Sequence, residues 1–568
     1  MRNKWIVCWA FFITVFFIGT NVYASEDVGE LKSQLQEMNQ QIKRLQKKIN
    51  TLEKENIDDR EEIEYIGDRL DKAELHTATD KISLGIEFRT KAESLHYDDM
   101  RAAPAALLGG IFAPVAAGGF NGAALNQIRQ GMQNMIGAGM VPPLEKYDED
   151  NDVIFTNKFL LNMKAKINNR LNFAGRLAAY KVWGDSTGAK FYQGSMSDVT
   201  FDGNTSSLPH GDTIHLERAY FVYSMDNDYI PVSLSIGRRP STEGPPLEYS
   251  NYSLEGGTPL ATIINWQFDG ASLTFGLEDL SGIPGASIKL CYGVGFEGDW
   301  GNSYTLNNSE AEVDDVNLAG VVATLFDNGD TSAVLNYAHA WDITDGFTGL
   351  TVMPFVPYTA DRDGDGIKEY YFDTNQAGYI TRMQPTTEIG DWDAATLLVR
   401  QNLYANIEKD VDLFLACSWS RTDPSKISEN PYYEMFGQGL LSSNGKLEDR
   451  DGYSLFIGAT FPMPYNAKLG LEYNWGSKYW FNFTGAEDSL IGSKLAVRGS
   501  VYEGYYIQPL VSSNFFIKLG AIYYNYKYTG SGNPMGAPVR ISGLTSLDAL
   551  NPVVDKVWNG YVSANLRF

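Results

Sequence analysis

The sequence predicts an all-β membrane protein, an antiparallel transmembrane β-barrel of about 16 strands (16–18), preceded by a signal peptide and an α-helical coiled coil. Three observations support this fold class. An apolar leader opens the chain, a strict heptad segment follows it, and from about residue 80 apolar and polar residues alternate to the C-terminus. Alternation with a period of two is typical of strands that turn one face to lipid and the other to a polar interior.

Composition and charge narrow the function classes. The 568 residues include 55 glycines and 13% aromatic residues, which favours strands over long apolar helices. A formal net charge of −24 argues against a nucleic-acid partner, because binding phosphates needs a basic surface. Only Cys291 and Cys417 remain after the leader, and the five histidines form no ligand motif. With no H-E-x-x-H or G-x-S-x-G motif either, we expect no enzyme activity.

Residues 1–24 are predicted to be a signal peptide. Arg2 and Lys4 precede an apolar run over residues 5–18, and the triplet ending at Ala24 suits signal peptidase. We expect cleavage after Ala24, and the alternative is an uncleaved anchor helix.

Residues 25–76 are predicted to form a coiled coil in the periplasm. From Leu31 to Ala73 the seam positions step by four and three, and Asn56 takes an a position as a polar register-setter. This strict pattern favours a homo-oligomer over a lone amphipathic helix, whose apolar stripe is wider. The number of chains, two or three, stays open.

Residues 77–568 carry the strands of the predicted barrel. The clearest hairpin pairs residues 159–167 with 171–179 across an Asn168-Asn169 turn. The strands have roughly ten residues, as a tilted membrane strand needs, whereas strands of soluble sandwiches are shorter. Long stretches at 184–211, 240–260, 343–392 and 422–450 alternate with tight turns. We expect the long stretches to face outside and the tight turns to face the periplasm.

The C-terminal strand alternates as a membrane strand and ends on an aromatic residue. Trp558, Val562, Leu566 and Phe568 share the apolar face. This ending resembles the signal by which the barrel-assembly machinery recognises outer-membrane barrels, although Ser563 stands where that motif commonly has Gly.

Signal peptide, coiled coil and barrel together, with the segments Leu216–Tyr220 and Ser235–Arg239, resemble a proteobacterial family of porin-like outer-membrane proteins. The chain is more loosely similar to phosphate-selective and siderophore porins. The resemblance implies a Gram-negative outer membrane, contact with its lipid, and passive diffusion of small solutes. The alternatives are a structural or scaffold barrel: an outer-membrane tether, a siderophore receptor or a sheath for a partner cytochrome.

Strand parity predicts which charged side chains face the lumen. Twelve basic residues point inward, against five acidic ones that include Glu472. Rings of basic groups on a pore wall favour anions, so we expect weak anion selectivity; the alternative is that these groups only solvate the lumen and pair across strands. The predicted pore-lining residues are Arg89, Lys164, Lys166, Arg176, Arg239, Lys289, Arg400, Lys468, Glu472, Lys494, Arg498, Lys518 and Arg567.

Two insertions interrupt the strands. Asp361, Asp363 and Asp365, with Gly366, match the first positions of a calcium loop spanning residues 361–373, but position 12 is Phe372 instead of Glu. We expect calcium binding there, and an acidic loop without a metal is the alternative. The Ala/Gly/Met-rich insert at 98–152 either narrows the pore or carries a small exterior helix.

Overall fold

The computed structural model describes most of the chain after residue 81. Met1–Ser83 and Leu84–Phe568 form separate units. The predicted signal peptide and coiled coil lie outside the described residues, apart from Lys43, which is helical. The described residues are 43, 82–104, 107, 113, 119–184, 214–225, 230–253, 256–298, 313–345, 349–352, 355–374, 380–383, 387–428, 446–487, 489–532, 538–546, 548–549 and 552–568.

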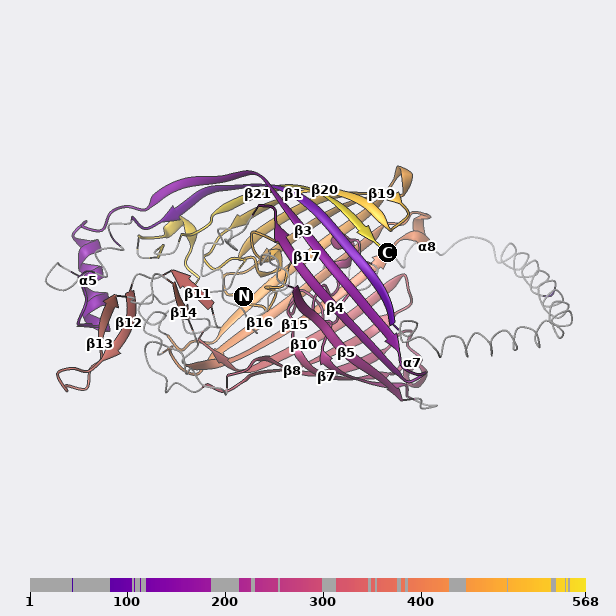
Figure 1. The fold of residues 1–568 in the computed structure, drawn as a ribbon, viewed down its shortest axis with the longest axis horizontal. Coiled ribbons are helices and arrows are strands. Elements are labelled where there is room, and N and C mark those ends of the chain that lie inside the picture. Colours follow the sequence, from indigo (N-terminus) through magenta and orange to yellow (C-terminus); the bar gives the residue numbers. More distant parts are fainter. Residues whose placement is uncertain are drawn as a thin grey trace, which may run out of the picture. The chain divides into compact units, whose positions relative to one another are not determined.

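Sixteen antiparallel strands of the described chain close into one barrel (Figure 1). Strands that follow one another along the barrel wall pair directly, and β1 closes the ring by pairing with β21 from Glu87↔Arg567 to Asp98↔Lys556. The predicted 16-stranded barrel is therefore confirmed. The barrel strands are β1 (Ile82–Ala102), β3 (Glu145–Lys166), β4 (Leu171–Val182), β5 (Ile214–Met225), β6 (Val232–Arg238), β7 (Asp269–Gly276), β8 (Ser287–Phe296), β9 (Val316–Asp327), β10 (Thr331–Thr344), β15 (Glu388–Asn402), β16 (Asp412–Pro424), β17 (Arg450–Met463), β18 (Ala467–Gly476), β19 (Gly499–Val511), β20 (Phe515–Tyr526) and β21 (Lys556–Arg567).

The two ends of the barrel differ in the length of their connections. At the short-turn end, strands are joined by tight turns or by the short helices α7 (Glu278–Ser281), α8 (Tyr404–Ile407) and η3 (Pro464–Asn466). Asn168 organises one such turn, because its Oδ1 accepts from the backbone N–H of Leu171 at 2.8 Å. Gly329 supplies a positive φ of 91° in another. The long connections gather at the opposite, long-loop end, as the spacing of the strands predicts.

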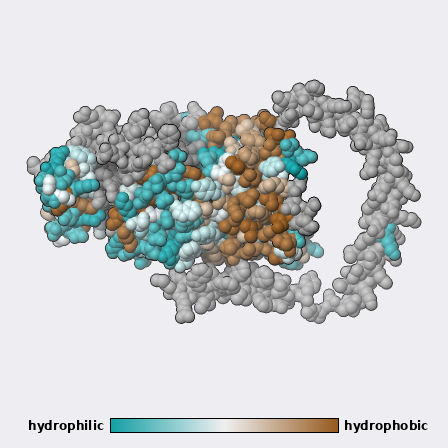
Figure 2. All heavy atoms as spheres, turned by 90° about the horizontal axis from the view of Figure 1, so that it is seen from below, coloured by the Kyte–Doolittle hydropathy of each residue, from teal (hydrophilic) through white to brown (hydrophobic). Residues whose placement is uncertain are grey.

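The outer face of the barrel carries large apolar side chains. Trp558, Val562 and Leu566 are exposed, whereas Val557 and Asn559 on either side of Trp558 are buried. Figure 2 shows the resulting apolar band across the barrel. A closed barrel with this band satisfies its backbone hydrogen bonds internally, so it spans a bilayer with strands. Among the described helices, none has the length and apolarity that a membrane crossing requires.

Parts of the long connections fold into the barrel and pack on its inner wall. Segment 239–268, with α6 (Glu248–Asn251), and segment 477–498, with η4 (Lys494–Ala496), meet where Asn265 donates to the Phe483 carbonyl at 2.7 Å. Phe483 packs edge-on against the wall residue Trp392 at 4.7 Å between ring centroids. These two inward segments share an apolar cluster with the wall: Ile263, Ile264, Phe268, Trp480, Phe481 and Phe483 with Val316, Leu318, Ala338, Ala340, Ile343, Ile389, Trp392 and Ala394.

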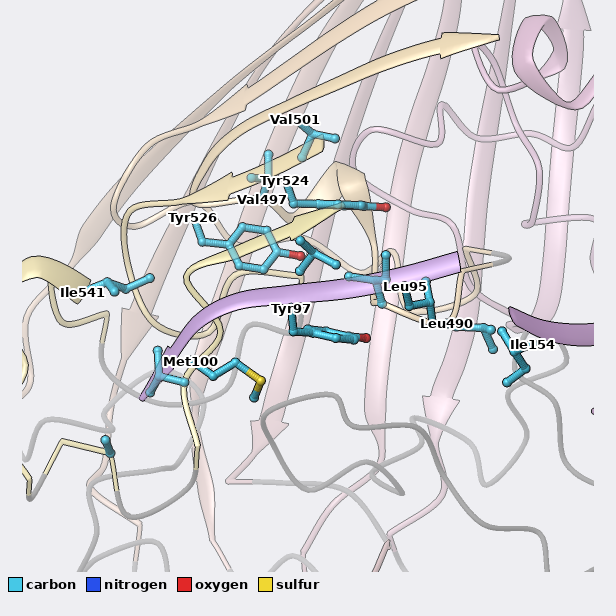
Figure 3. Packing of buried hydrophobic residues seen from close by; sticks show 14 of the residues in the cluster. Leu95, Tyr97, Met100, Ile154, Leu490, Val497, Val501, Tyr524, Tyr526 and Ile541 are labelled. Atoms are coloured by element: carbon cyan, nitrogen blue, oxygen red, sulfur yellow. The ribbon is translucent and has the colours of Figure 1, made fainter. Parts of the chain in front are cut away.

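A second apolar cluster joins segment 477–498 to β1 and β20 (Figure 3). Leu490 and Val497 lie in it beside Leu95, Tyr97 and Tyr524, and Ile541 of η5 (Ile541–Gly543) adds to it. All these side chains are fully or almost fully buried. A large part of the lumen is therefore dry protein core.

Two expectations for these segments are wrong. The described residues of 240–260 run into the barrel instead of facing outside, because Leu247 and Leu260 find apolar partners on the inner wall. Strand parity predicted Lys494 and Arg498 to face the lumen from a strand, but β19 begins only at Gly499. Both residues thus come from the inward segment 477–498, where Lys494 lies in η4.

The two insertions form a small subdomain at the long-loop end, which we call the satellite. It contains β2 (Ala123–Ala124), α5 (Leu125–Gly137), β12 (Phe355–Ala360) and β13 (Glu369–Thr374). Ile128 and Met132 of α5 share its core with Tyr370 and Phe372 of β13. A further pair joins β11 (Gly349–Val352) to β14 (Ile380–Met383). The helix of the first insert, α5, is thus part of the satellite (Figure 1) and contributes to none of the described lumen clusters.

Candidate functional site: a charged cavity in the lumen

A polar cavity of about 120 Å³ lies inside the barrel. Wall strands β1, β3, β20 and β21 face it from one side, and the two inward segments face it from the other. Nine charged residues line it among those described: Arg89, Lys91, Lys158, Lys494 and Lys518, with Glu217, Glu243, Glu487 and Glu503.

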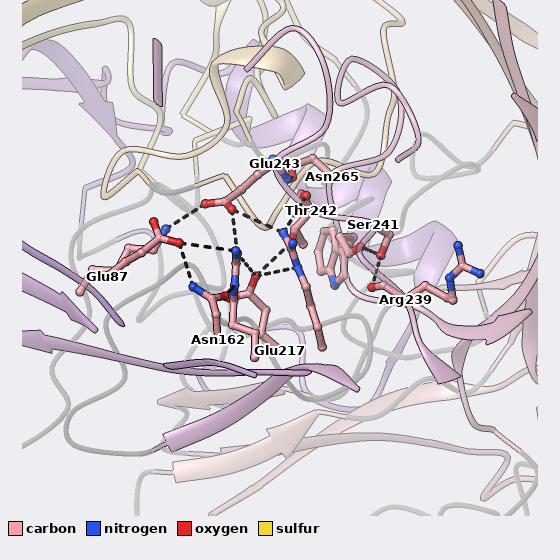
Figure 4. A network of polar contacts seen from close by, with 12 residues as sticks. Glu87, Asn162, Glu217, Arg239, Ser241, Thr242, Glu243 and Asn265 are labelled. Carbon is pink, nitrogen blue, oxygen red and sulfur yellow. Dashed lines mark hydrogen bonds and ion pairs between the residues drawn. The ribbon is translucent and has the colours of Figure 1, made fainter. Parts of the chain in front are cut away.

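The first of two ion-pair clusters centres on Glu243 of segment 239–268 (Figure 4). Its carboxylate lies 2.9 Å from the guanidinium of Arg176 and 3.0 Å from Nζ of Lys158. Glu217 is 3.2 Å from the same guanidinium. Burial alone raises the pKa of Glu243, but Lys158, Arg176 and Arg218 outweigh that effect and hold the pKa well below its usual range.

A β-bulge delivers two of these charges to the lumen. Across β4 and β5, Arg176 faces Arg218 and Leu177 faces Leu216, so Glu217 is the extra residue. Glu217 and Arg218 are consequently both buried, although strict alternation places only one of them inside.

The second cluster centres on Lys494 of segment 477–498. Its Nζ lies 2.6 Å from Glu472 and 2.5 Å from Glu503, and Lys518 lies 3.6 Å from Glu503. The hydroxyl of Tyr561 donates to Glu503 at 2.7 Å. Burial alone lowers the pKa of Lys494, but the two carboxylates reverse that and raise it. Lys494 thus fastens the inward segment to the wall as an ammonium group.

Pairing offsets much of the basic excess that parity predicts. Arg400 lies 2.7 Å from Glu248 of α6, and Lys468 lies 3.7 Å from Asp412. Together with the two clusters, these contacts give five of the twelve predicted inward basic residues a carboxylate neighbour: Arg176, Arg400, Lys468, Lys494 and Lys518. Around the cavity the described residues carry five basic groups and four acidic ones.

The remaining predicted residues lie elsewhere in the barrel. Arg239 follows β6 and donates to Ser272 at 2.6 Å, and Lys289 donates to Thr258 at 3.1 Å. Arg498 donates to the Trp480 carbonyl at 3.0 Å and is fully enclosed. Lys164 and Lys166 are exposed near the short-turn end, and Arg567 lies 4.8 Å from the centre of the Phe516 ring. Of the thirteen predicted residues, the cavity brings together Arg89, Lys494 and Lys518.

Sequence reasoning missed several residues of the cavity, for two different reasons. Lys91 and Lys158 share the inward parity of Arg89 and Lys164, so alternation could have found them. Glu243 and Glu487 lie on segments that are not strands, and alternation carries no information there. Glu487 is buried beside Ser493, which donates to it at 2.7 Å, and burial raises the pKa of Glu487 to about 7.

The acidic loop of the satellite gathers four carboxylates. Ligand atoms of Asp361, Asp363, Asp365 and Glu369 lie within 4.8 Å of one another. Asp361 also accepts from the backbone N–H groups of Gly364 and Gly366, at 2.6 and 2.9 Å. Phe372, at position 12 of the predicted loop, is buried in the satellite core. Glu369 therefore stands in a different position from the last ligand of a helix–loop–helix site, and calcium binding stays a prediction.

The residues of the predicted assembly signal lie on the outer face. Trp558 stacks on Tyr523 at 4.2 Å, and Phe568 is exposed. The backbone of Phe568 exchanges two hydrogen bonds with Ile86, at 2.8 and 3.0 Å, so the last residue takes part in barrel closure.

Residues 148–568 match the family model described as "Protein of unknown function (DUF3373)". No curated protein matches the chain. Among solved structures, OprB of Pseudomonas putida at high pH aligns with a TM-score of 0.39 and 8% identity, over 86% of this chain and 94% of that one. OmpF of Salmonella typhi in complex with daunomycin aligns with a TM-score of 0.39 and 10% identity, over 87% of this chain and 99% of that one. An anion-selective porin from Comamonas acidovorans aligns with a TM-score of 0.37 and 11% identity, over 86% of this chain and 99% of that one.

Proposed function

We propose that this chain, which belongs to the DUF3373 family, forms a narrow channel for small solutes across the outer membrane of a Gram-negative cell. The observation that carries the proposal is the charged cavity inside a closed 16-stranded barrel. A membrane-spanning wall with a polar interior space is the arrangement that passive channels use.

The inward segments support a small pore. The apolar clusters around Trp392 and Trp480 on one side, and around Leu95 and Tyr524 on the other, fill part of the lumen with buried side chains. Solutes are therefore expected to pass along the charged cavity, and the conductance should be far lower than that of a barrel of this size with an empty lumen.

The balance of charge supports a weak preference for anions. Five basic groups face four acidic ones at the cavity, and burial raises the pKa of Glu487 to about 7. Part of the negative charge is thus absent near neutral pH. Small anions are the proposed solutes, with a modest excess of anion over cation flux.

Planar-bilayer recording of the full chain tests the channel. We expect small, discrete conductance steps and a reversal potential of anion-preferring sign in a salt gradient. Lys158→Gln removes one lining charge and should move the reversal potential toward cation preference. Lys409→Gln, at an exposed position just after α8, is the matched control and should leave it unchanged. Absence of any conductance in the folded protein would contradict the channel proposal.

The packed lumen favours a second candidate, a structural barrel that tethers the outer membrane through the N-terminal segment. Its supporting observation is the apolar core that joins the inward segments to the wall. This candidate predicts no conductance from a correctly folded barrel, together with a loosened envelope when residues 25–76 are deleted.

A further inference from the structure

A groove of about 720 Å³ opens on the satellite, between α5 and the β12–β13 hairpin. This volume lies within the range of about 300–1,000 Å³ that small-ligand sites usually have. The groove is separate from the lumen cavity, with which it shares no lining residue. It is lined by Ala124, Leu125, Asn126, Arg129, Gln130, Gln133, Thr359, Ile367, Lys368 and Tyr370.

The lining of the groove is cationic, in contrast to the chain as a whole. Among its described lining residues, Arg129 and Lys368 contribute two positive charges and there is no Asp or Glu, although the carboxylates of the acidic loop are sequence neighbours of Lys368. The chain carries a net charge of −24, so a concave surface without carboxylates is a departure from its general character. A positive concave surface raises the local concentration of anions.

The remaining polar groups suit hydroxyl groups on a ligand. Asn126, Gln130 and Gln133 offer carboxamides, each with donors and an acceptor, and Thr359 offers a hydroxyl. Such groups can bond neighbouring hydroxyls of a sugar ring in pairs. Leu125, Ile367 and Tyr370 add apolar surface against which the C–H face of a sugar ring can pack.

The helix presents these groups as a fixed row. Asn126, Arg129, Gln130 and Gln133 follow the spacing i, i+3, i+4 and i+7, so they share one face of α5. Ile128 and Met132 anchor the helix in the satellite core. Because the scaffold is packed, little backbone ordering is needed when a ligand binds.

We propose that this groove binds an acidic saccharide at the long-loop end of the barrel. Arg129 and Lys368 hold its carboxylate or phosphate groups, while the carboxamides of α5 hold its hydroxyls. Binding there is independent of whether the barrel conducts. The saccharide is either free in solution or the sugar part of a lipopolysaccharide in the same membrane, and the two sources share this chemistry.

Calorimetry with the full chain in detergent tests the groove, with trigalacturonic acid as the acidic probe and galactotriose as its neutral counterpart. We expect the acidic trisaccharide to bind at least tenfold more tightly than the neutral one. The double variant Arg129→Gln/Lys368→Gln should weaken acidic binding at least tenfold, and Arg129→Lys should keep most of it. The control Lys164→Gln/Lys166→Gln removes two exposed charges near the short-turn end and should change nothing.

Purified lipopolysaccharide then identifies the source. If lipopolysaccharide competes with the acidic trisaccharide for the groove, the ligand is the membrane saccharide. If trisaccharide binding is unchanged in the presence of lipopolysaccharide, the ligand is a free saccharide. Equal affinity for the acidic and neutral probes, or unchanged affinity in the folded double variant, would overturn the proposal. Heat-modifiable migration on a gel verifies that each variant retains its barrel, and single-channel recording separates this test from that of the channel.

Discussion

Glu487 illustrates how burial changes a single residue of the lumen. Its side chain lies on an inward segment, where it accepts from the Ser493 hydroxyl, lies close to Lys494 and lines the cavity. Burial raises the pKa of Glu487 to about 7, against about 4.3 in an unfolded chain. The folded protein thus keeps a proton that the unfolded chain releases between these two pH values.

The sign of the pH effect follows from that proton. Because the folded state binds more protons than the unfolded state from about pH 4 to about pH 7, the free energy of unfolding should fall as the pH rises through this window. The total fall amounts to at most about 4 kcal/mol, and Glu487→Gln should flatten it. Urea unfolding followed by tryptophan fluorescence measures it. Glu408→Gln, at an exposed turn, should leave the pH dependence as it is in the parent chain; equal slopes for both variants would refute the role of Glu487.

At the scale of elements, the inward segment 477–498 is held by both packing and charge. Trp480 is fully buried and donates to the Leu495 carbonyl at 2.8 Å, while Lys494 joins the wall through Glu472 and Glu503. The wall makes room for this segment with a small residue: a Cβ on Gly452 of β17 would come within 2.4 Å of the Tyr479 carbonyl oxygen. Segment and wall are thus complementary in shape.

Trp480→Ala should destabilise the protein by about 3–5 kcal/mol, the usual loss when a buried large aromatic is removed. The loosened segment should also raise the channel conductance. Urea unfolding and bilayer recording measure the two effects. Trp183→Ala, at a position about half exposed at the end of β4, should change the free energy of unfolding by less than about 1 kcal/mol. An unchanged conductance in Trp480→Ala would show that segment 477–498 does not narrow the path.

The acidic loop of the satellite is a second element whose role can be measured. If calcium binds there, calorimetry should detect it with the full chain, and Asp361→Asn/Asp365→Asn should abolish it. Asp279→Asn, which removes an exposed carboxylate from α7, serves as the control. Heat of binding that persists in the double variant would place calcium elsewhere.

At the scale of the whole molecule, barrel closure depends on both ends of the described chain. β1 pairs with β21, and the backbone of Phe568 bonds to Ile86. The side chains of Trp558, Val562 and Leu566 face outward beside it. The same strand thus completes the ring and displays the predicted assembly signal.

Deletion and substitution of Phe568 should separate these two roles. Deletion removes both the backbone hydrogen bonds to Ile86 and the aromatic side chain, whereas Phe568→Ala removes only the aromatic side chain. If the assembly machinery reads the aromatic side chain, both variants should accumulate far less folded barrel in cells, measured by heat-modifiable migration. Normal assembly of Phe568→Ala would limit the role of this residue to closure.

The sequence by itself determined the barrel. Alternation over strands such as 159–167 and 171–179 depends only on which neighbours meet lipid and which do not, so the period, the short turns and the count of 16 strands could all be predicted locally. Strand parity also placed Arg176 and Lys518 inside correctly, because a strand has only two faces.

Only the tertiary structure decided what fills the lumen. Residues 239–268 and 477–498 have no regular period, and their direction follows from apolar partners on distant strands, such as Trp392 for Phe483. The same holds for charge: Glu243 pairs with Arg176, 67 residues away, and Lys494 pairs with Glu472, 22 residues away, so the lumen's predicted basic excess becomes a nearly balanced cavity. Local alternation determines the wall, whereas long-range contacts determine the interior.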